Sequence, residues 1–509
     1  MNGQTVIIIG GGMGGLFTGA LLTKEGYKVT VIEKNPVIGG GLQVFQRAGV
    51  TFETGMHILG GLRPGNSIYK ICNYLGIMDK LDIRDADYDC IDSITYLSDG
   101  HTYRIPDGRE NFTSYFISEF PESEADIRRY VDAVYKLADE VDFFFLRPSG
   151  DGMVTHSEQF LWSASEFIDY YIKDVRLRDV LAYMNPMYGG VEGHTPAYIH
   201  ALINVLYIES TSRFVGGSYQ MAEALADVIK EGGGEIVKGE MVTAVHIDEN
   251  RMATSVTTSA GKDYQADLYI SDIHPSRLVD IVDSGAFPKS YRNRIASIPN
   301  TYSAFTLYIK FRPQSFPYIN HTCYYQDDYG LVWHHGEYDA ETWPRGFMYM
   351  TPADPGQGEY AAKMIVNCLM PFSVVEKWHD TKVGRRGAEY EQWKKEHAEK
   401  VLDRLEKLHP GFRGTIDQMW TSSPLTIRDF YNQPDGALYG VKKDCKDMML
   451  SQIPIWTKVR NLLLTGQCIN LHGICGVPLT AINTVEALIG QNKLLEKINL
   501  YNNTDYGKN

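Results

Sequence analysis

The sequence predicts an α/β fold built on a parallel sheet, and three observations carry this prediction. An apolar, β-branched run at residues 6–9 is too short for a helix and leads directly into a cluster of glycines. A helical stretch then ends at Gly26, and a second strand at residues 28–32 closes on Glu33. Helix and strand signals alternate again in two later parts of the chain. Strands that alternate with helices are typical of a parallel sheet.

The glycine cluster after the first strand fits the pattern G-x-G-x-x-G. In this pattern the first glycine allows a tight turn, the second lets a diphosphate approach the backbone, and the third lets helix and strand pack closely. The helix that follows presents unpaired N–H groups to the phosphates. A glycine-rich turn without a ligand is the alternative, but strand, loop, helix end and acidic residue coincide here. The predicted dinucleotide-binding loop comprises Gly10, Gly12, Met13, Gly14 and Gly15.

Glu33 is the acidic residue that such a site requires at the end of its second strand. It follows the glycine loop by roughly 20 residues, the spacing that places a carboxylate on the hydroxyls of the adenosine ribose. A carboxylate at this position would repel a 2′-phosphate. The sequence therefore predicts FAD or NAD as the bound nucleotide and disfavours NADP.

Two later segments extend the nucleotide-binding domain. In the first, three glycines at residues 232–234 stop a helix that has a broad apolar face. In the second, a short apolar strand precedes a glycine-containing loop and the C-terminal helix, and residues 501–509 form a polar tail that we expect to fray. The predicted helices are residues 219–231 and 479–498, and the predicted strands are residues 235–237, 241–247, 266–271 and 462–464.

The length of 509 residues exceeds what one hydrophobic core usually serves, so we expect two domains. The first is a discontinuous Rossmann-like nucleotide-binding domain, and the second is an α+β substrate domain inserted into it. The inserted blocks are rich in Tyr, Trp and Phe, which predicts a ligand cavity between the domains, although these side chains could also fill an ordinary core. The first domain comprises residues 1–80, 213–280 and 431–509, and the second comprises residues 81–212 and 281–430.

Charge and cysteine content exclude several classes of function. The net charge of −14 and the pI near 5.5 disfavour a nucleic-acid partner, which would require clustered Lys and Arg. The seven cysteines are scattered and lack metal-ligand spacing, so we expect reduced thiols in a cytoplasmic protein without a metal site. His334 and His335 are adjacent, and adjacent side chains on a strand would point to opposite faces, which argues against a metal pair.

Membrane contact is left open by the sequence. The N-terminus lacks the basic region of a signal peptide, and no run of 18 apolar residues occurs, so we expect no membrane span. Residues 142–148 hold three consecutive phenylalanines. We interpret them as a helix end packed into the core; the alternative is an apolar lip at a substrate entrance or at the inner face of a membrane.

Four stretches of the chain together resemble the FAD-dependent phytoene desaturase superfamily. Within it, the chain is most similar to the branch of the all-trans-retinol 13,14-reductases (retinol saturases) and carotenoid isomerases. The paired glycine after the acidic strand end is one of these stretches, and the saturase pattern F-D-T-G-x-H-Y-x-G is another, here with Glu for Asp and Leu for Tyr. The other two resemble the motifs P-x-G-A-x-Y-G and L-T-G-Q. The four stretches are residues 33–40, 51–60, 434–440 and 463–467.

The resemblance implies FAD and assigns further residues to it. The ADP half would lie against the glycine loop, Glu33 and Lys34, with the adenine on the backbone of Val242. Two departures stand out, because Gly41 occupies a position where many relatives have Arg, and Gln467 replaces a common Asp. The residues implied along the diphosphate, ribityl chain and flavin are Gly40, Gly41, Leu42, Gly55, Met56, His57, Gly466, Gln467, Gly476 and Val477.

The implied chemistry is oxidation or reduction of a carbon–carbon double bond in an apolar polyene or isoprenoid lipid. No second glycine motif follows a strand, so one nucleotide would be bound stably, and transient NAD(P)H is a candidate electron donor. If saturation requires a proton donor, His57 and His472 are candidates, with Tyr439 a third. A structural role is the alternative for each histidine, and Glu53 is interpreted as a loop or ribose contact.

Three other functions stay open. A cis–trans carotenoid isomerase would leave the product mass unchanged, whereas saturation would add two hydrogens. An amine oxidase shares the fold, and peroxide release with amines would indicate it. A lipid-binding protein that keeps FAD without catalysis would hold a flavin that no donor or substrate reduces or reoxidises.

Overall fold

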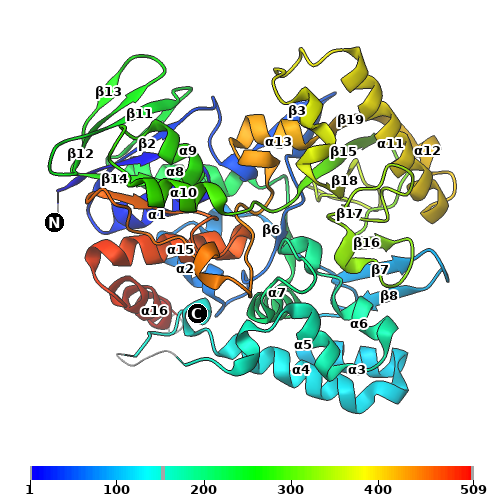
Figure 1. Ribbon diagram of the computed structural model, residues 1–509. Helices are drawn as coiled ribbons and strands as arrows, with labels where there is room; N and C mark the ends of the chain where they lie inside the picture. The colour runs from blue at the N-terminus through cyan, green and yellow to red at the C-terminus, as the bar shows by residue number, and fades with distance from the viewer. Residues whose placement is uncertain (1–2, 151–154, 506–509) are drawn as a thin grey trace.

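One side of the molecule, at the left in Figure 1, is built on a five-stranded parallel sheet with strand order β10-β2-β1-β14-β20. The computed structural model describes residues 3–150 and 155–505. The sheet collects strands from three distant parts of the chain, which confirms the parallel sheet predicted from the sequence. Its strands are β1 (Thr5–Ile9), β2 (Lys28–Glu33), β10 (Glu235–Lys238), β14 (Leu268–Ser271) and β20 (Leu462–Leu464).

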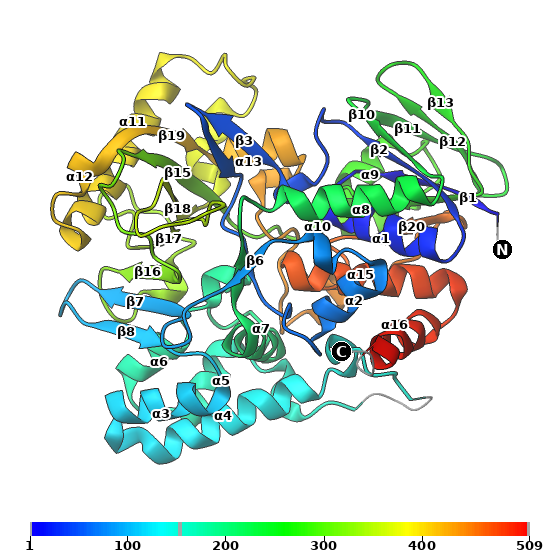
Figure 2. The same cartoon turned by 180° about the vertical axis from the view of Figure 1, so that it is seen from behind.

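The two faces of this sheet are buried under different layers because side chains alternate along each strand. Val6 and Ile8 face three helices that lie side by side in Figure 2, whereas Ile7 and Ile9 face a small antiparallel sheet and two short helices. The three helices are α1 (Met13–Lys24), α8 (Tyr219–Glu231) and α15 (Gly473–Ile489). The layer opposite consists of β11 (Val242–Ile247), β12 (Ala253–Thr258), β13 (Asp263–Tyr264), α9 (Pro275–Ile281) and α10 (Lys289–Ser297).

A second, seven-stranded sheet is built from both inserted blocks. Its order is β19-β15-β18-β17-β16-β7-β8, and the parallel pair β16 and β7 joins the second block to the first. Helix α11 (Ala388–Leu408) and helix α12 (Phe412–Thr415) pack on it around an aromatic core. Its strands are β7 (Asp92–Tyr96), β8 (Thr102–Ile105), β15 (Ser303–Phe311), β16 (Thr322–Gln326), β17 (Gly346–Met350), β18 (Lys363–Met370) and β19 (Ile416–Ser422).

A helical layer forms the base of the molecule in Figure 1. It shares one continuous core with the helix-covered face of the parallel sheet. Its helices are α3 (Arg109–Glu119), α4 (Glu124–Asp139), α5 (Ala164–Tyr171), α6 (Val175–Leu181) and α7 (Ala197–Ser210). The connecting elements are β3 (Val44–Arg47), β4 (Val50–Glu53), β5 (Ile58–Leu59), α2 (Ser67–Leu75), β6 (Ile83–Asp85), β9 (Ser212–Phe214), α13 (Pro424–Tyr431) and α14 (Met448–Ser451).

The phenylalanine cluster after α4 packs into the core, as the sequence interpretation expected. Phe144 and Leu146 are almost fully buried, and Phe143 and Phe145 pack against the same core from its edge. A 3-10 turn, Asp142–Phe145, carries the cluster. None of these side chains lines the cavity described below.

The C-terminal segment differs from the single helix predicted over residues 479–498. The first helix, α15, begins at Gly473, and the chain breaks at Gly490, where φ is +109°. A second helix, α16 (Lys493–Asp505), leaves at an angle of 119°. The Glu486 carboxylate stabilises the break, because it accepts the backbone N–H groups of Asn492 and Leu495, both at 3.0 Å.

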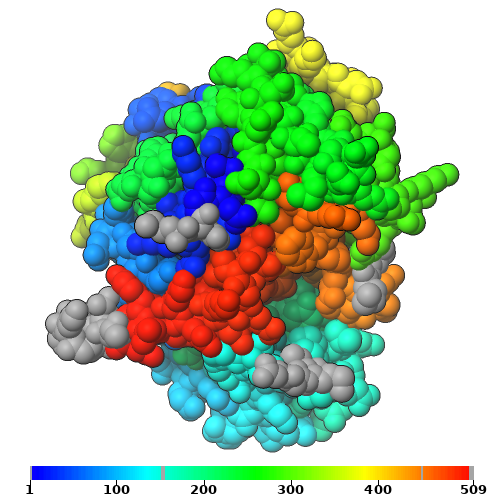
Figure 3. All heavy atoms as spheres, turned by 90° about the vertical axis from the view of Figure 1, so that its left-hand side faces the viewer, coloured from blue at the N-terminus to red at the C-terminus, as the bar shows by residue number. Residues whose placement is uncertain are grey.

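Helix α16 also extends into the tail that was expected to fray, while residues 506–509 lie outside the described part of the chain. The C-terminal segment forms a band between the nucleotide-binding strands and the helical layer (Figure 3). Among the described residues, no single helix is long and apolar enough to span a membrane, and only the bent pair α15 and α16 meets both criteria together.

Substitution of Gly15 tests the packing of α1 on β1. An added Cβ would lie 2.2 Å from the carbonyl oxygen of Gly10, so the helix would have to move away from the loop. We expect Gly15→Ala to lower the free energy of unfolding by about 2 kcal/mol, measured by urea denaturation. Gly41→Ala is the matched control, since its Cβ would meet nothing within 4 Å. Equal stability of the two variants would contradict this packing.

Candidate active site

A cavity of about 610 Å³ runs from the glycine loop into the space between the two sheets. This volume lies within the range that small-molecule and cofactor sites occupy. One end, which we call the nucleotide end, is lined by Ile9, Gly10, Gly12, Met13, Gly14, residues 32–35 and 241–243, and Asp272, Ile273, Arg277, Asp280 and Ile281. The other, which we call the inner end, is lined by residues 54–58 together with side chains from α7, the seven-stranded sheet and the segment after α13.

The glycine loop forms the floor of the nucleotide end. Gly10 turns the chain with φ +104° and donates its N–H to Ile32 at 2.9 Å. Gly12 is the N-cap of α1 and has no side chain that could cap the helix; the carboxyl group that approaches this first turn is that of Asp272, which follows β14. Gly10, Gly12, Met13 and Gly14 line the cavity, whereas Gly15 is packed beneath the loop.

Glu33 is held at the edge of the cavity by its backbone neighbours. One carboxylate oxygen accepts the N–H of Gly11 and the other accepts the N–H of Asn35, both at 2.8 Å. The side chain is only 6% exposed, and this burial raises its pKa although the two hydrogen bonds oppose the shift. The carboxylate is therefore fixed in orientation beside the loop, and its contact with a ribose stays a prediction.

The predicted flavin-side segments meet at this cavity as well. Gly40 approaches Gly12 so closely that a Cβ on it would lie 3.1 Å from the Gly12 Cα atom. Gly41 borders open space, which shows where the arginine of many relatives would project. The cavity is lined by Gly40, Gly41, Leu42, Gly55, Met56, His57, Val242, Gln467 and Val477.

Gly466 and Gly476, like Gly15, are predicted cofactor residues that do not line the cavity. Each permits a close approach of two chain segments. A Cβ on Gly466 would lie 2.2 Å from the Asp272 carboxylate, and a Cβ on Gly476 would lie 2.4 Å from the Leu471 side chain. The second contact brings the start of α15 to the cavity, where Gly473 and Ile474 line it.

The inner end is mainly apolar and aromatic. Its polar side chains include Thr54, His57, Asn432 and Gln433 and a pair from the seven-stranded sheet, in which the Thr306 hydroxyl donates to Asn367 Oδ1 at 3.0 Å. Among the described residues, no Asp, Glu, Lys or Arg side chain lines this end. Its apolar and aromatic lining comprises Met56, Ile58, Met187, Tyr207, Leu438, Tyr439 and Ile474.

His57 is held toward the cavity by a buried carboxylate. Its Nδ1 atom lies 3.0 Å from Glu53 Oε1, and the same oxygen accepts the backbone N–H of Ser218 at 2.9 Å. A carboxylate oxygen can only accept a hydrogen bond, so we assign a proton to His57 Nδ1, which donates it to Glu53. The other ring nitrogen, Nε2, is then available to the cavity. Glu53 is thus a loop contact that also orients His57.

The other two proton-donor candidates are placed differently. Tyr439 lines the cavity, and burial raises the pKa of its phenol, which therefore stays protonated. His472 is the N-cap of α15 and does not line the cavity; its ring lies behind that of Tyr439, with 4.7 Å between the centroids. Burial lowers the pKa of His472 to about 4, so its imidazole is neutral at physiological pH.

The adjacent histidines lie away from this cavity. His334 ends a 3-10 turn instead of lying on a strand, so the strand argument against a metal pair does not apply. Their partners separate them nonetheless, because His334 Nδ1 contacts Glu337 Oε1 and His335 Nε2 contacts Gln326 Oε1. Across the described chain, no group of three or more His, Cys, Asp or Glu side chains is arranged to hold a metal ion.

Sequence reasoning missed several residues of the cavity wall. Asp272 follows β14 directly, and since the carboxyl ends of parallel strands meet at one edge, its position could have been inferred. Arg277 and Asp280 lie on the next helix, α9, and also line the nucleotide end. Thr306 and Asn367 could not have been found, because their strands belong to inserted blocks whose register the sequence does not reveal.

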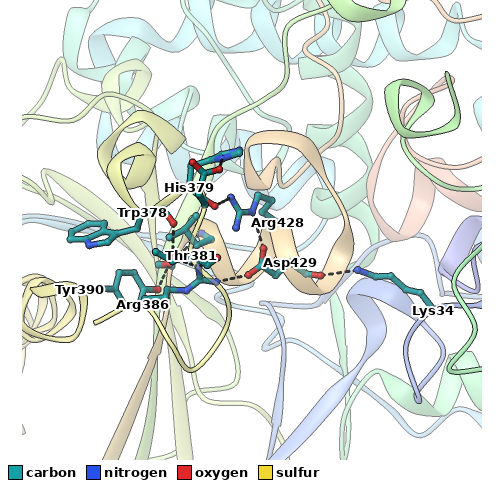
Figure 4. Close-up of polar contacts among 11 residues, drawn as sticks. Lys34, Trp378, His379, Thr381, Arg386, Tyr390, Arg428 and Asp429 are labelled. Atoms are coloured by element: carbon teal, nitrogen blue, oxygen red, sulfur yellow. Dashed lines mark hydrogen bonds and ion pairs between the residues drawn. The ribbon is translucent and has the colours of Figure 1, made fainter. Parts of the chain in front are cut away.

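Helix α13 forms another wall of the cavity and is fastened to both domains (Figure 4). Lys34 Nζ donates to the carbonyl of Asp429 at 2.7 Å, which ties the end of β2 to this helix. The Asp429 carboxylate in turn pairs with Arg386 and with Arg428, the latter at 2.8 Å. The guanidinium of Arg386 also donates to the Thr381 hydroxyl at 2.8 Å. Lys34 lines the nucleotide end, but its ammonium is bound to α13. A contact of Lys34 with the cofactor therefore stays a prediction.

Removal of the Asp429 carboxylate tests this fastening. The Arg386 side chain is only 4% exposed and would be left as a buried charge without its carboxylate partner. We expect Asp429→Ala to lower the free energy of unfolding by about 3 kcal/mol. Glu389→Ala breaks the exposed pair with Lys377 and should cost under about 1 kcal/mol. Similar denaturation midpoints for the two variants would show that the buried network does not stabilise the fold.

Comparison with known proteins gives concordant matches over nearly the whole chain. The family model described as flavin containing amine oxidoreductase matches residues 13–489. The chain is 25% identical to the all-trans-retinol 13,14-reductase of Rattus norvegicus, over 96% of this chain and 86% of that protein. It is 23% identical to the chloroplastic prolycopene isomerase 2 of an Oncidium hybrid cultivar, over 94% and 82%.

A solved structure shows the same fold. An oxidoreductase from Methanosarcina mazei aligns with a TM-score of 0.62 at 17% identity and covers 95% of this chain and 100% of its own. The fold is therefore the α/β FAD-binding type with a substrate domain, as the sequence predicted. The chain belongs to the family of flavin-containing amine oxidoreductases, and it is an FAD-dependent oxidoreductase.

Proposed function

We propose that this oxidoreductase acts on a carbon–carbon double bond of an apolar polyene or isoprenoid lipid and that it saturates this bond. The observation that carries the proposal is the lining of the inner end, which combines Met, Ile, Leu and Tyr side chains with uncharged polar ones and one histidine, His57. A cavity wall of this kind binds an extended hydrocarbon by burying its surface. A charged amine would instead favour a carboxylate near it, and the described lining of the inner end has none.

The residues present fit FAD. The uncapped first turn of α1 and the close approach of Gly40 to Gly12 leave a backbone cradle that suits a diphosphate, and the fixed Glu33 carboxylate suits the ribose hydroxyls. The segments 40–42 and 55–57, with Gln467 and Val477, would hold the flavin half. Bound FAD supplies hydride transfer to or from carbon, which is the redox step.

The chain itself supplies the proton that saturation also requires, and we assign this proton to His57. Addition to a double bond delivers a hydride to one carbon and a proton to its neighbour. The His57 imidazole lines the inner end, and Glu53 fixes its orientation and compensates the positive charge of the protonated ring. Tyr439 borders the same space but keeps its proton, so we place it as a contact to the hydrocarbon.

The relatives support this class of substrate. The names of two of them describe a reductase of all-trans-retinol and an isomerase of prolycopene, both of which are polyenes. The isomerase relative also makes cis–trans isomerisation the second candidate function. We further propose transient NAD(P)H as the electron donor and peripheral contact with a membrane, since an apolar substrate resides there.

Turnover with a polyene tests the proposal. We expect the purified holoprotein to show flavin bands near roughly 370 and 450 nm that bleach on anaerobic addition of NADH or NADPH. Addition of a retinoid, carotenoid or prenyl lipid in detergent should restore the bands and raise the product mass by two hydrogens. Unchanged mass with an altered double-bond geometry would indicate isomerisation. Reduction of the flavin by amines, with oxygen-dependent release of peroxide and no turnover of any polyene, would overturn the proposal.

The role of His57 is tested by His57→Gln. We expect the rate of saturation to fall by about 10² or more, because an amide cannot transfer the proton, while the flavin spectrum stays unchanged. Glu53→Gln should lower the rate of saturation less than His57→Gln does. It should also shift, along the pH axis, the limb of the pH–rate profile that is absent in His57→Gln. His334→Gln, outside the cavity, is the control. Full activity of His57→Gln at every pH would assign the proton to another donor.

A further inference from the structure

Asp272 brings a carboxylate into the glycine loop. It is the first residue after β14, and its backbone N–H donates to the carbonyl of Ile9 at 2.9 Å, which fixes it beside β1. A Cβ on Gly14 would lie 2.2 Å from Oδ1, and a Cβ on Gly12 would lie 2.6 Å from Oδ2. A Cβ on Gly466, in the loop after β20, would also lie 2.2 Å from Oδ1. The side chain is therefore enclosed by glycines of two loops.

The position of this carboxylate coincides with the anion site of the loop. It lies at the start of α1, where the N-cap Gly12 has no side chain, and backbone hydrogen bonds from Gly15 and Gly12 act to lower its pKa against the effect of burial. The same first turn presents the N–H groups that bind a diphosphate in this type of loop. Asp272 also lines the nucleotide end of the cavity. A bound dinucleotide would thus bring its diphosphate against a carboxyl group that already contacts the loop.

Among the residues that the structure describes, no positively charged side chain pairs with the Asp272 carboxyl group. Glu33, at the end of β2, raises its pKa by repulsion, and Cys468, in the loop after β20, is neutral because burial raises its own pKa. On α9, the N-cap His274 is neutral, since burial lowers its pKa to about 4, and Arg277 lies nearest to Asp280 among the carboxylates, at 4.0 Å. The ammonium of Lys34 is bound to α13.

We propose that Asp272 binds FAD as a neutral carboxylic acid whose O–H donates to a diphosphate oxygen, so that the protein takes up one proton from solvent when it binds its cofactor. Burial raises the pKa of Asp272 to about 7 before any second anion is present, although the loop hydrogen bonds act to lower it. The negative diphosphate favours the protonated form further. The inference rests on FAD as cofactor and does not depend on the substrate.

The sign of the pH effect follows from linkage. The carboxyl pKa is higher in the complex than in the free protein, so affinity for FAD is at its maximum below about pH 7 and weakens about tenfold for each pH unit above it, until the pKa of the complex is reached. Glu33 acts in the opposite direction, because it accepts ribose hydroxyls as a carboxylate and its contribution weakens as pH falls. The loss of affinity at alkaline pH therefore belongs to Asp272.

Titration of the apoprotein with FAD between about pH 6 and pH 9, followed by quenching of flavin fluorescence, measures this dependence. Asp272→Asn replaces the acid with an amide that donates a hydrogen bond at every pH. We expect its affinity to be flat across this range and to exceed the wild-type affinity by tenfold or more near pH 9. Asp227→Asn is the control, since Asp227 is a half-exposed carboxylate on α8 that does not line the cavity and its loss should leave the wild-type slope unchanged.

A second measurement on the wild-type protein does not depend on any variant. Calorimetric titration with FAD near pH 8, in two buffers with different ionisation enthalpies, counts the protons taken up on binding. We expect an uptake close to one proton, and close to none for Asp272→Asn. Wild-type binding without proton uptake, or an alkaline loss of affinity that persists in Asp272→Asn, would overturn the proposal.

Discussion

The close approach of three backbone segments at the carboxyl edge of the parallel sheet is the constraint on which the site depends. The loop after β1, the residue after β14 and the loop after β20 come together because their strands are neighbours in one sheet. No side chain larger than hydrogen is accommodated at Gly14, Gly15 or Gly466 without movement of this edge. The glycines therefore serve packing as well as ligand binding, and this close approach gives the cavity its floor.

The two inserted blocks supply the rest of the cavity as one unit. Strand β7 of the first block pairs in parallel with β16 of the second, so neither block has a complete sheet of its own. Helix α13 then links this unit to the nucleotide-binding strands through Lys34 and through the Asp429 ion pairs. The same helix therefore lines the cavity and connects the seven-stranded unit to the nucleotide-binding strands.

Short-range sequence patterns were sufficient to predict the nucleotide-binding strands. They failed where contacts between distant parts of the chain determine the structure. The strand ending at Ile9, the loop glycines and the helix stop at Gly232 follow from short-range pattern, and the structure confirms them. The C-terminal helix over residues 479–498 was predicted wrongly, because α15 already begins at Gly473 and because Glu486 caps a second helix that no local periodicity separates from the first. His57 was found as a candidate from its motif, but its orientation by Glu53 and Ser218 depends on a contact 165 residues away in sequence.

The sequence by itself determined the sheet, the dinucleotide loop, the acidic strand end and the resemblance that pointed to FAD. These features depend on glycine geometry and on alternation along single strands, which act over a few residues. Only the tertiary structure decided which side chains face the inner end, that His472 lies behind Tyr439, and that Asp272 enters the loop. Such placements are set by the register and packing of strands that lie hundreds of residues apart, and no local pattern encodes them.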